Sequence, residues 1–130
     1  MDLGNKIATT LTLIPQTTTA GTVYGTGISR KWFEGCVYVG MLGKITGTPD
    51  ATTVTYQLQE SDALASGYTD ITDYYCVVTT TGTRKEVNLP MQNLKEYIRP
   101  SAVVAFSGGT TPYASISGLL IYGGSKEYPV

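Results

Sequence analysis

Much of this chain consists of short segments in which apolar and polar residues alternate, and short turns of Gly, Pro and Thr separate those segments. The segments Val37–Ile71 and Tyr97–Gly123 each hold two such runs around one turn, which is the pattern of a β-hairpin. The alternation is most regular over Thr53–Glu60. No segment keeps an apolar i, i+3, i+4 pattern for about 10 residues. The sequence therefore predicts an all-β protein.

The spacing of the runs predicts how the strands are arranged. About seven to nine strands, roughly 10 residues apart and joined by Gly/Pro/Thr turns, are typical of an antiparallel β-sandwich. A small closed β-barrel is the alternative. A chain of 130 residues is expected to form one such domain. We expect an N-terminal arm and loop over residues 1–22, the sandwich over 23–124 and a tail over 125–130.

The alternation also predicts which side chains form the core. Over Cys36–Ile45, one set of alternate residues is expected to point inward and the other set, which includes Tyr38 and Leu42, outward. Val23–Ser29 is expected to be a short edge strand. Pro100 has no amide hydrogen and predicts an edge, a bulge or a switch between sheets. The predicted core consists of Val37, Val39, Met41, Ile45, Val54, Tyr56, Leu58, Ile98, Val104, Phe106, Ile116, Leu120 and Ile121.

The charge content excludes some classes of partner. Charged residues make up 15% of the chain, against roughly 25% in ordinary soluble domains. Nine Lys and Arg against ten Asp and Glu give a net charge of −1, so no basic face for nucleic acid is expected. No apolar run approaches the roughly 20 residues that span a bilayer, and no secretory signal pattern opens the chain. A surface poor in charge and rich in Thr, Ser, Gly and Tyr is typical of a protein inside an assembly.

The side chains that carry most enzyme chemistry are scarce. The chain has no His, and its carboxylates occur singly or in polar loops. Glu60 and Asp62 are half of a calcium site at most, because the EF-hand pattern is absent. Cys36 and Cys76 are too few for a disulfide framework and are expected to be reduced, semi-buried thiols. We therefore expect no enzyme activity, cofactor, metal or small-molecule substrate.

Large aromatic and apolar residues are the candidates for a partner interface. Trp32 and Phe33 follow two cations, and they either plug one end of the sandwich, contact a protein, or stack on a sugar or base. The apolar residues of the N-terminal arm form either an edge strand of the chain's own sandwich or a strand added to a neighbouring subunit. The candidate interface residues are Leu3, Ile7, Leu11, Leu13, Ile14, Trp32, Phe33, Tyr74, Tyr75 and Tyr128.

Several short motifs resemble a family of small virion proteins encoded among the head genes of tailed bacteriophages. In Gly43–Thr72, a strand ends in QESD, a Gly/Ser loop follows, and YTDI opens the next strand. The second half has YIR at Tyr97–Arg99, SGGTTP at Ser107–Pro112 and an apolar strand that ends in Gly-Gly. The resemblance covers Val37–Gly124. The chain departs from the family pattern at Pro100, and the segments 1–22 and 74–89 lie outside the motifs.

The resemblance implies a capsid decoration, or cement, protein on the outer surface of the head. Its partners would be the major capsid protein and copies of itself, with a trimer expected by analogy with other cement proteins. It would be made in the host cytoplasm and reside on the capsid surface of the virion. The alternatives are another structural virion protein (tail tube, connector or head-tail completion) and a carbohydrate-binding or adhesion module that uses Trp32.

Overall fold

Nine β-strands make up the regular structure of the described part of the chain. The computed structural model describes residues 7–30, 33–90 and 93–123, with side chains from Thr12 onward. No helix occurs within these ranges. The strands are β1 (Ile7–Thr18), β2 (Gly21–Tyr24), β3 (Ile28–Ser29), β4 (Gly35–Thr46), β5 (Ala51–Ser61), β6 (Thr69–Val78), β7 (Thr83–Pro90), β8 (Tyr97–Ser107) and β9 (Tyr113–Gly123).

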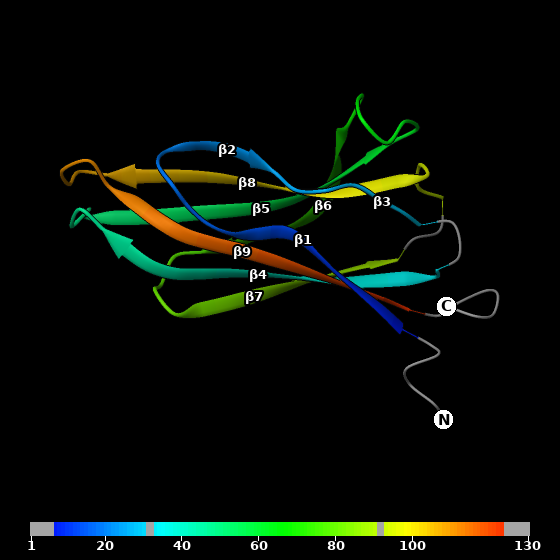
Figure 1. The fold of residues 1–130 in the computed structure, drawn as a ribbon, viewed down its shortest axis with the longest axis horizontal. Helices are drawn as coiled ribbons and strands as arrows, with labels where there is room; N and C mark the ends of the chain where they lie inside the picture. The colour runs from blue at the N-terminus through cyan, green and yellow to red at the C-terminus, as the bar shows by residue number, and fades with distance from the viewer. Residues whose placement is uncertain (1–6, 31–32, 91–92, 124–130) are drawn as a thin grey trace.

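The strands form two antiparallel sheets that pack face to face (Figure 1). The first, which we call sheet A, has the order β1-β9-β4-β7. The second, sheet B, has the order β2-β8-β5-β6, and β3 also pairs with β8. Both sheets keep free edges, so the predicted β-sandwich is confirmed and the closed barrel is wrong. The two short strands β2 and β3 replace the single edge strand expected over Val23–Ser29.

The two predicted hairpins are wrong, because β4 and β5 belong to different sheets, and so do β8 and β9. β4 pairs instead with β7 and β9, while β5 pairs with β6 and β8. The two turns that were predicted to be hairpin loops are instead arches, in which the chain crosses from one sheet to the other. Strand orders 1-9-4-7 and 2-8-5-6 are those of a jelly roll, the two-sheet fold built from Greek keys.

The two arches pack against each other, which explains their glycines. The amide of Thr110 donates a hydrogen bond to the carbonyl oxygen of Gly47 at 2.9 Å. Gly47 and Gly109 have φ angles of 91° and 86°, in the left-handed region that favours glycine. A Cβ on Gly109 would also lie 2.7 Å from the Gly47 carbonyl oxygen. This close contact requires glycine in both arches.

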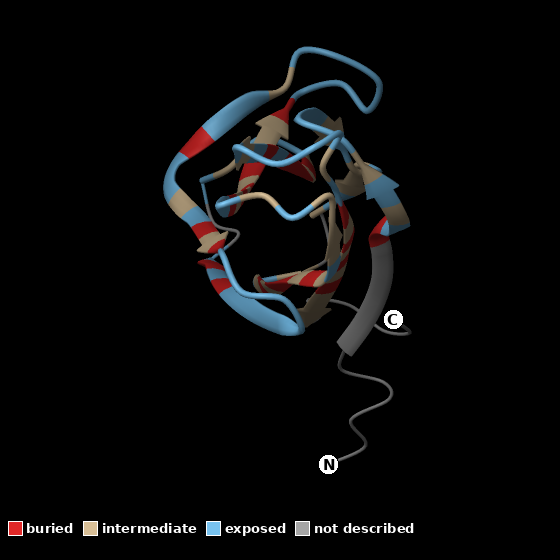
Figure 2. Ribbon diagram, turned by 90° about the vertical axis from the view of Figure 1, so that its left-hand side faces the viewer, coloured by how far each residue is buried: buried red, intermediate tan, exposed pale blue. Residues whose placement is uncertain are grey.

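The prediction of which residues point into the core is confirmed for β5, whereas for most of β4 it is wrong. Val54, Tyr56 and Leu58 are fully buried between the sheets, as are Ile98, Ile116 and Leu120 among the other predicted core residues. In β4 it is Tyr38 and Leu42 that enter the core, at 0% and 1% exposure. In Figure 2, buried segments alternate with intermediate and exposed ones along the strands.

Val37, Val39 and Met41 alternate with the core residues of β4, and they lie on the outer face of sheet A. Ile121 of β9 lies there as well, because Leu120 beside it points inward. Ile45 does pack against the core, since a register shift between Leu42 and Ile45 reverses the phase at the end of β4. The alternation could not assign this phase, because both faces of β4 and β9 carry apolar residues.

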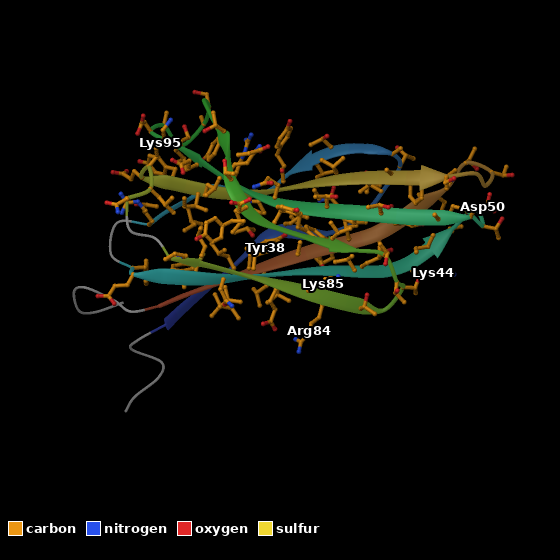
Figure 3. The ribbon with its side chains drawn as sticks, turned by 180° about the vertical axis from the view of Figure 1, so that it is seen from behind. Tyr38, Lys44, Asp50, Arg84, Lys85 and Lys95 are labelled. Carbon is orange, nitrogen blue, oxygen red and sulfur yellow. The ribbon has the colours of Figure 1, made fainter. Side chains whose placement is uncertain are left out.

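Two buried tyrosines occupy the centre of the core, each above a glycine. Gly40 of β4 and Gly118 of β9 are cross-strand partners in sheet A. The ring of Tyr56, from sheet B, covers Gly40, and the ring of Tyr38 covers Gly118. The two ring centroids are 5.7 Å apart, and Tyr38 lies between the sheets in Figure 3. The glycine pair therefore makes room for both rings.

Pro100 lies inside β8, a central strand, rather than at an edge. In an antiparallel strand the N and O atoms of one residue face the same neighbour. The carbonyl oxygen of Pro100 accepts a hydrogen bond of 2.8 Å from the amide of Gly25, in the break between β2 and β3. The missing amide hydrogen of Pro100 faces this break, where β8 has no regular partner strand, so the proline fits.

Replacing Gly40 with Ala is expected to destabilise the protein by about 3 kcal/mol through overpacking. The new Cβ would lie 2.7 Å from Cγ and Cε2 of Tyr56, a ring held between two sheets. Gly35→Ala in the same strand is the control, because its Cβ would meet a neighbouring atom only at 3.4 Å. Urea denaturation measures both. Equal stability of the two variants would show that the ring of Tyr56 does not depend on Gly40.

The two buried phenol groups are expected to respond differently to loss of the hydroxyl. Tyr56 donates a hydrogen bond to the carbonyl oxygen of Met41, so Tyr56→Phe should cost about 1 kcal/mol. The hydroxyl of Tyr38 is buried with no partner among the described residues, so Tyr38→Phe should be neutral or stabilising by about 1 kcal/mol. Thermal or urea unfolding compares them. A larger loss for Tyr38→Phe than for Tyr56→Phe would contradict this assignment.

Candidate functional site

The apolar residues predicted in the N-terminal arm divide between the core and the surface. Residues 7–18 form β1, which pairs with β9 of the same chain, so this part of the arm is an edge strand of the chain's own sandwich. Leu13 is 1% exposed and belongs to the core, whereas Ile14 is 65% exposed. Leu3, and the side chains of Ile7 and Leu11, lie outside the described residues.

The predicted aromatic residues divide in the same way. Phe33 packs edge-on against Tyr122 with ring centroids 4.4 Å apart, and both pack against the core, which matches the interpretation of Phe33 as an end plug. Tyr74 also packs against the core, while Tyr75 is 53% exposed on β6. Trp32 and Tyr128 lie outside the described residues. Of the described candidates, Ile14 and Tyr75 are the exposed ones, and they lie on different sheets.

The outer face of sheet A carries apolar side chains on its two central strands. Val37 is paired with Ile121, and Val39 with Leu119, across β4 and β9. Together with Met41 these residues form what we call the apolar row: Val37, Val39, Met41, Leu119 and Ile121. Val39 is only 7% exposed although it is outside the core between the sheets, because its neighbours in the row and on β7 cover it. A solvated outer face would instead carry polar residues at these positions.

Two hollows lie at the ends of the apolar row. The larger, of about 840 Å³, is lined by Met41, Ser117 and Arg84, with Pro15 on the β1 side. The smaller, of about 610 Å³, includes Val37 and Ile121 of the row. The labelled Arg84 lies on β7 at the margin of this face (Figure 3). The outer face of sheet A is therefore apolar in the middle, hollowed at both ends and bordered by a charged strand.

Strand β5 presents polar side chains on the outer face of sheet B. Thr53, Thr55, Gln57 and Gln59 of β5 alternate with the buried residues, as the sequence predicted. Gln57 extends across to β6, where its side-chain amide donates to the carbonyl oxygens of Ile71 and Tyr74 at 2.8 and 3.2 Å. These bonds hold the irregular part of β6, where the register shifts. The outward residues of β5 are thus polar, whereas those of β4 at Val37, Val39 and Met41 are apolar.

Arg99 of β8 is held between two tyrosines on the outer face of sheet B. Its guanidinium carbon lies 4.3 Å from the ring centroid of Tyr24 and 4.0 Å from that of Tyr68. Its Nε donates to Oε1 of Gln59 at 2.9 Å, and Nε2 of Gln59 donates to Oδ1 of Asp70 at 2.9 Å. We call Tyr24, Gln59, Tyr68, Asp70 and Arg99 the arginine cluster.

The loop between β5 and β6 is linked to the arginine cluster through Tyr68. The hydroxyl of Tyr68 donates to the carbonyl oxygen of Leu64 at 2.8 Å and lies over Gly27, where any side chain would clash with it. Ser61, 1% exposed, accepts a hydrogen bond of 3.0 Å from the amide of Ala63 and donates to the carbonyl oxygen of Ser66. The cluster is therefore built on a fixed loop.

Sequence reasoning did not identify the arginine cluster as a site, although three of the quoted motifs meet in it. Gln59 belongs to QESD, Tyr68 and Asp70 to YTDI, and Arg99 to YIR. The feature that could have revealed the cluster is the cross-strand register, which places Gln59 opposite both Asp70 and Arg99. That register depends on β8 pairing with β5, and the sequence pattern had indicated pairing with the strand after it.

The ionisable groups with shifted pKa values in the described ranges are thiols and phenols. Burial raises the pKa of Cys36 from its ordinary 9.0 to about 12, and it also raises the pKa values of Tyr38, Tyr56 and Cys76. The two cysteines are buried and unpaired, as predicted. Among the described residues, no three His, Cys, Asp or Glu side chains lie together as metal ligands would, and no helix has the length and apolarity to cross a membrane.

Comparison with known proteins gives relatives in fold only. No family model matches the chain, and no curated protein matches it in sequence. The VP2 subviral particle of infectious bursal disease virus matches with a TM-score of 0.51 and 17% identity, over 95% of this chain and 34% of that one. YomS, derived from the SPBc2 prophage, matches with a TM-score of 0.42 and 12% identity, over 88% and 94% of the two chains.

A third similar structure is TmCBM61 in complex with β-1,4-galactotriose, with a TM-score of 0.44 and 13% identity, over 84% of this chain and 70% of that one. This chain spans about a third of the VP2 chain that it matches. At 17% identity, the similarity to VP2 bears on the fold alone, and it agrees with the two-sheet sandwich described above.

The buried thiols are expected to resist alkylation in the folded protein. Iodoacetamide attacks the thiolate, and at pH 8.5 a thiol with a pKa of about 12 is almost entirely protonated. Cys76 should react before Cys36, because Lys85 opposes the rise of its pKa. The stability that the protonated Cys36 contributes is complete below pH 9 and is lost as the pH rises toward 12. Mass spectrometry checks the order; rapid native modification of Cys36 would contradict its burial.

Proposed function

We propose that this chain is a non-enzymatic structural virion protein, a capsid decoration protein that binds the outer surface of a phage head through the outer face of sheet A. Its partners would be the major capsid protein and copies of itself. Three observations support the proposal: the sequence motifs that resemble those of small head-cluster proteins, the low charge content of 15%, and the apolar row on the outer face of sheet A.

The apolar row is the observation that carries the proposal. Its five side chains lie side by side on two paired strands, outside the core between the sheets. Strands β4, β7 and β9 stay in register over the eight residues Gly35–Leu42 of β4. Three strands about 4.8 Å apart and eight residues long project roughly 400 Å². That area is about half of the roughly 800 Å² that one partner contributes to a stable protein interface.

Binding of this face would stabilise the shell by mass action. A protein that binds the assembled capsid, and does not bind dissociated subunits, lowers the free energy of the assembled state by its own binding free energy. Apolar area removed from water contributes about 25 cal/mol per Å², part of which the cost of association offsets. The mechanism needs no catalytic group, only a rigid sandwich that presents a preformed face.

Placing a charge in the apolar row is expected to abolish binding to heads. Met41 lines the larger hollow and is half-buried, so Met41→Glu would bury a carboxylate in the interface and weaken binding at least 30-fold, or about 2 kcal/mol. Val103→Glu, at a residue 43% exposed on the outer face of sheet B, is the matched control. Co-sedimentation with purified heads and tails of the virus measures binding, and thermal unfolding checks that both variants fold.

Three results would count against this proposal. Wild-type affinity of folded Met41→Glu for heads would remove sheet A as the docking face. Co-sedimentation with tails alone would support a tail or connector role in place of decoration. Absence of binding to either particle would remove the virion role altogether.

A further inference from the structure

We propose that the arginine cluster on the outer face of sheet B is a saccharide-binding site, which takes a neutral pyranose with two adjacent hydroxyl groups. This inference goes beyond the proposed decoration role and stands on different residues. It starts from the guanidinium of Arg99, whose carbon lies over the rings of Tyr24 and Tyr68, 4.3 and 4.0 Å from their centroids. A guanidinium stacked in this way is held in one plane, and its edges become the available binding surface.

The guanidinium of Arg99 has N–H donors that its own contacts within the described ranges do not use. A guanidinium carries five N–H groups, and within the described ranges the hydrogen bond that Arg99 makes uses Nε, which donates to Gln59. The Nη groups are thus available to a ligand. Two neighbouring hydroxyl oxygens of a pyranose are close enough together for each to accept a hydrogen bond from the guanidinium edge. The cluster therefore offers a pair of fixed donors to a vicinal diol.

Acceptors lie beside these donors, and they select the charge of the ligand. Asp70 is exposed, and its Oδ1 accepts from Gln59, so the carboxylate has further lone pairs for ligand hydroxyl hydrogens. The carboxylate of Asp70, joined to the guanidinium through Gln59, disfavours a phosphate, a sulfate or a second carboxylate. A neutral ligand that both donates and accepts hydrogen bonds fits best.

Tyr24 supplies the flat apolar surface that a sugar ring needs. Its ring is covered by Arg99 on one side, yet the residue is 55% exposed, so much of the ring stays open to a ligand. Tyr68 is fixed by its hydrogen bond to Leu64 and completes the stack. The C–H groups of a pyranose pack on tyrosine while its hydroxyls reach the polar groups beside it. One open ring and one fixed ring thus give the site a preformed shape.

The surroundings favour a saccharide over a protein partner. Hot spots for proteins combine Tyr and Arg with an apolar surround that excludes water. Here the outward residues of β5 beside Arg99 are Gln57 and Gln59, whose side chains are amides. The outer faces of the two sheets point away from each other (Figure 1), so a molecule docked through sheet A leaves the cluster uncovered.

An array of immobilised oligosaccharides, probed with the free full-length protein, tests the site without any capsid. The array carries neutral hexose glycans beside uronic-acid and sulfated glycans. We expect saturable binding to a neutral hexose glycan. Arg99→Ala and Tyr24→Ala should each weaken it at least tenfold, and Arg99→Lys should as well, since an ammonium lacks the planar pair of donors. Tyr75→Ala is the matched control, because Tyr75 is 53% exposed on the same sheet and makes no contact with Arg99.

Thermal unfolding separates a binding role of the cluster from a purely structural one. Tyr24 lies on the short edge strand β2, so Tyr24→Ala should keep the wild-type melting temperature while it loses the glycan. The proposal is overturned if no neutral glycan binds, if only acidic glycans bind and salt abolishes the binding, or if Tyr75→Ala weakens binding equally. Loss of head binding by Tyr24→Ala without any glycan binding would assign the cluster to a protein partner instead.

Discussion

The close packing of two tyrosine rings on a pair of glycines determines how the two sheets meet. Tyr56 reaches across from sheet B and lies on Gly40, while Tyr38 lies on Gly118, the cross-strand partner of Gly40. A side chain at either glycine would push a ring out of the core, so the spacing of the sheets at this point depends on two missing side chains. Since β4 and β9 carry these glycines inward, their other residues, the apolar row, must face outward.

The sequence best predicted which residues point into the core in strands that have one polar face. In β5, Thr and Gln alternate with Val54, Tyr56 and Leu58, so the inward face was assigned correctly. In β4 both faces are apolar, and the larger Tyr38 entered the core in place of Val37 and Met41. Strand partners were harder still, because a turn of four or five residues can close a hairpin or cross between two sheets. The arginine cluster depends on those partners and was therefore missed as a site.

The two outer faces suggest a division of roles. Sheet A presents apolar side chains and hollows, a surface that gains free energy by losing water. Sheet B presents hydroxyls, amides and a stacked guanidinium, a surface whose groups form directional hydrogen bonds. In the proposed roles, the outer face of sheet A would bind the capsid, and the outer face of sheet B would bind a saccharide. Because the two faces belong to different sheets, substitutions in one can be tested without disturbing the other.

The position of β9 between β1 and β4 has a consequence for synthesis of the chain. Sheet A has no continuous backbone ladder until β9 pairs with strands made a hundred residues earlier on one side and about eighty earlier on the other. The ribosome therefore releases most of the sequence before that sheet can exist. Folding of such non-local strand pairs takes on the order of milliseconds to seconds. During that interval the apolar row is incomplete and open to water, which makes a nascent chain prone to aggregation.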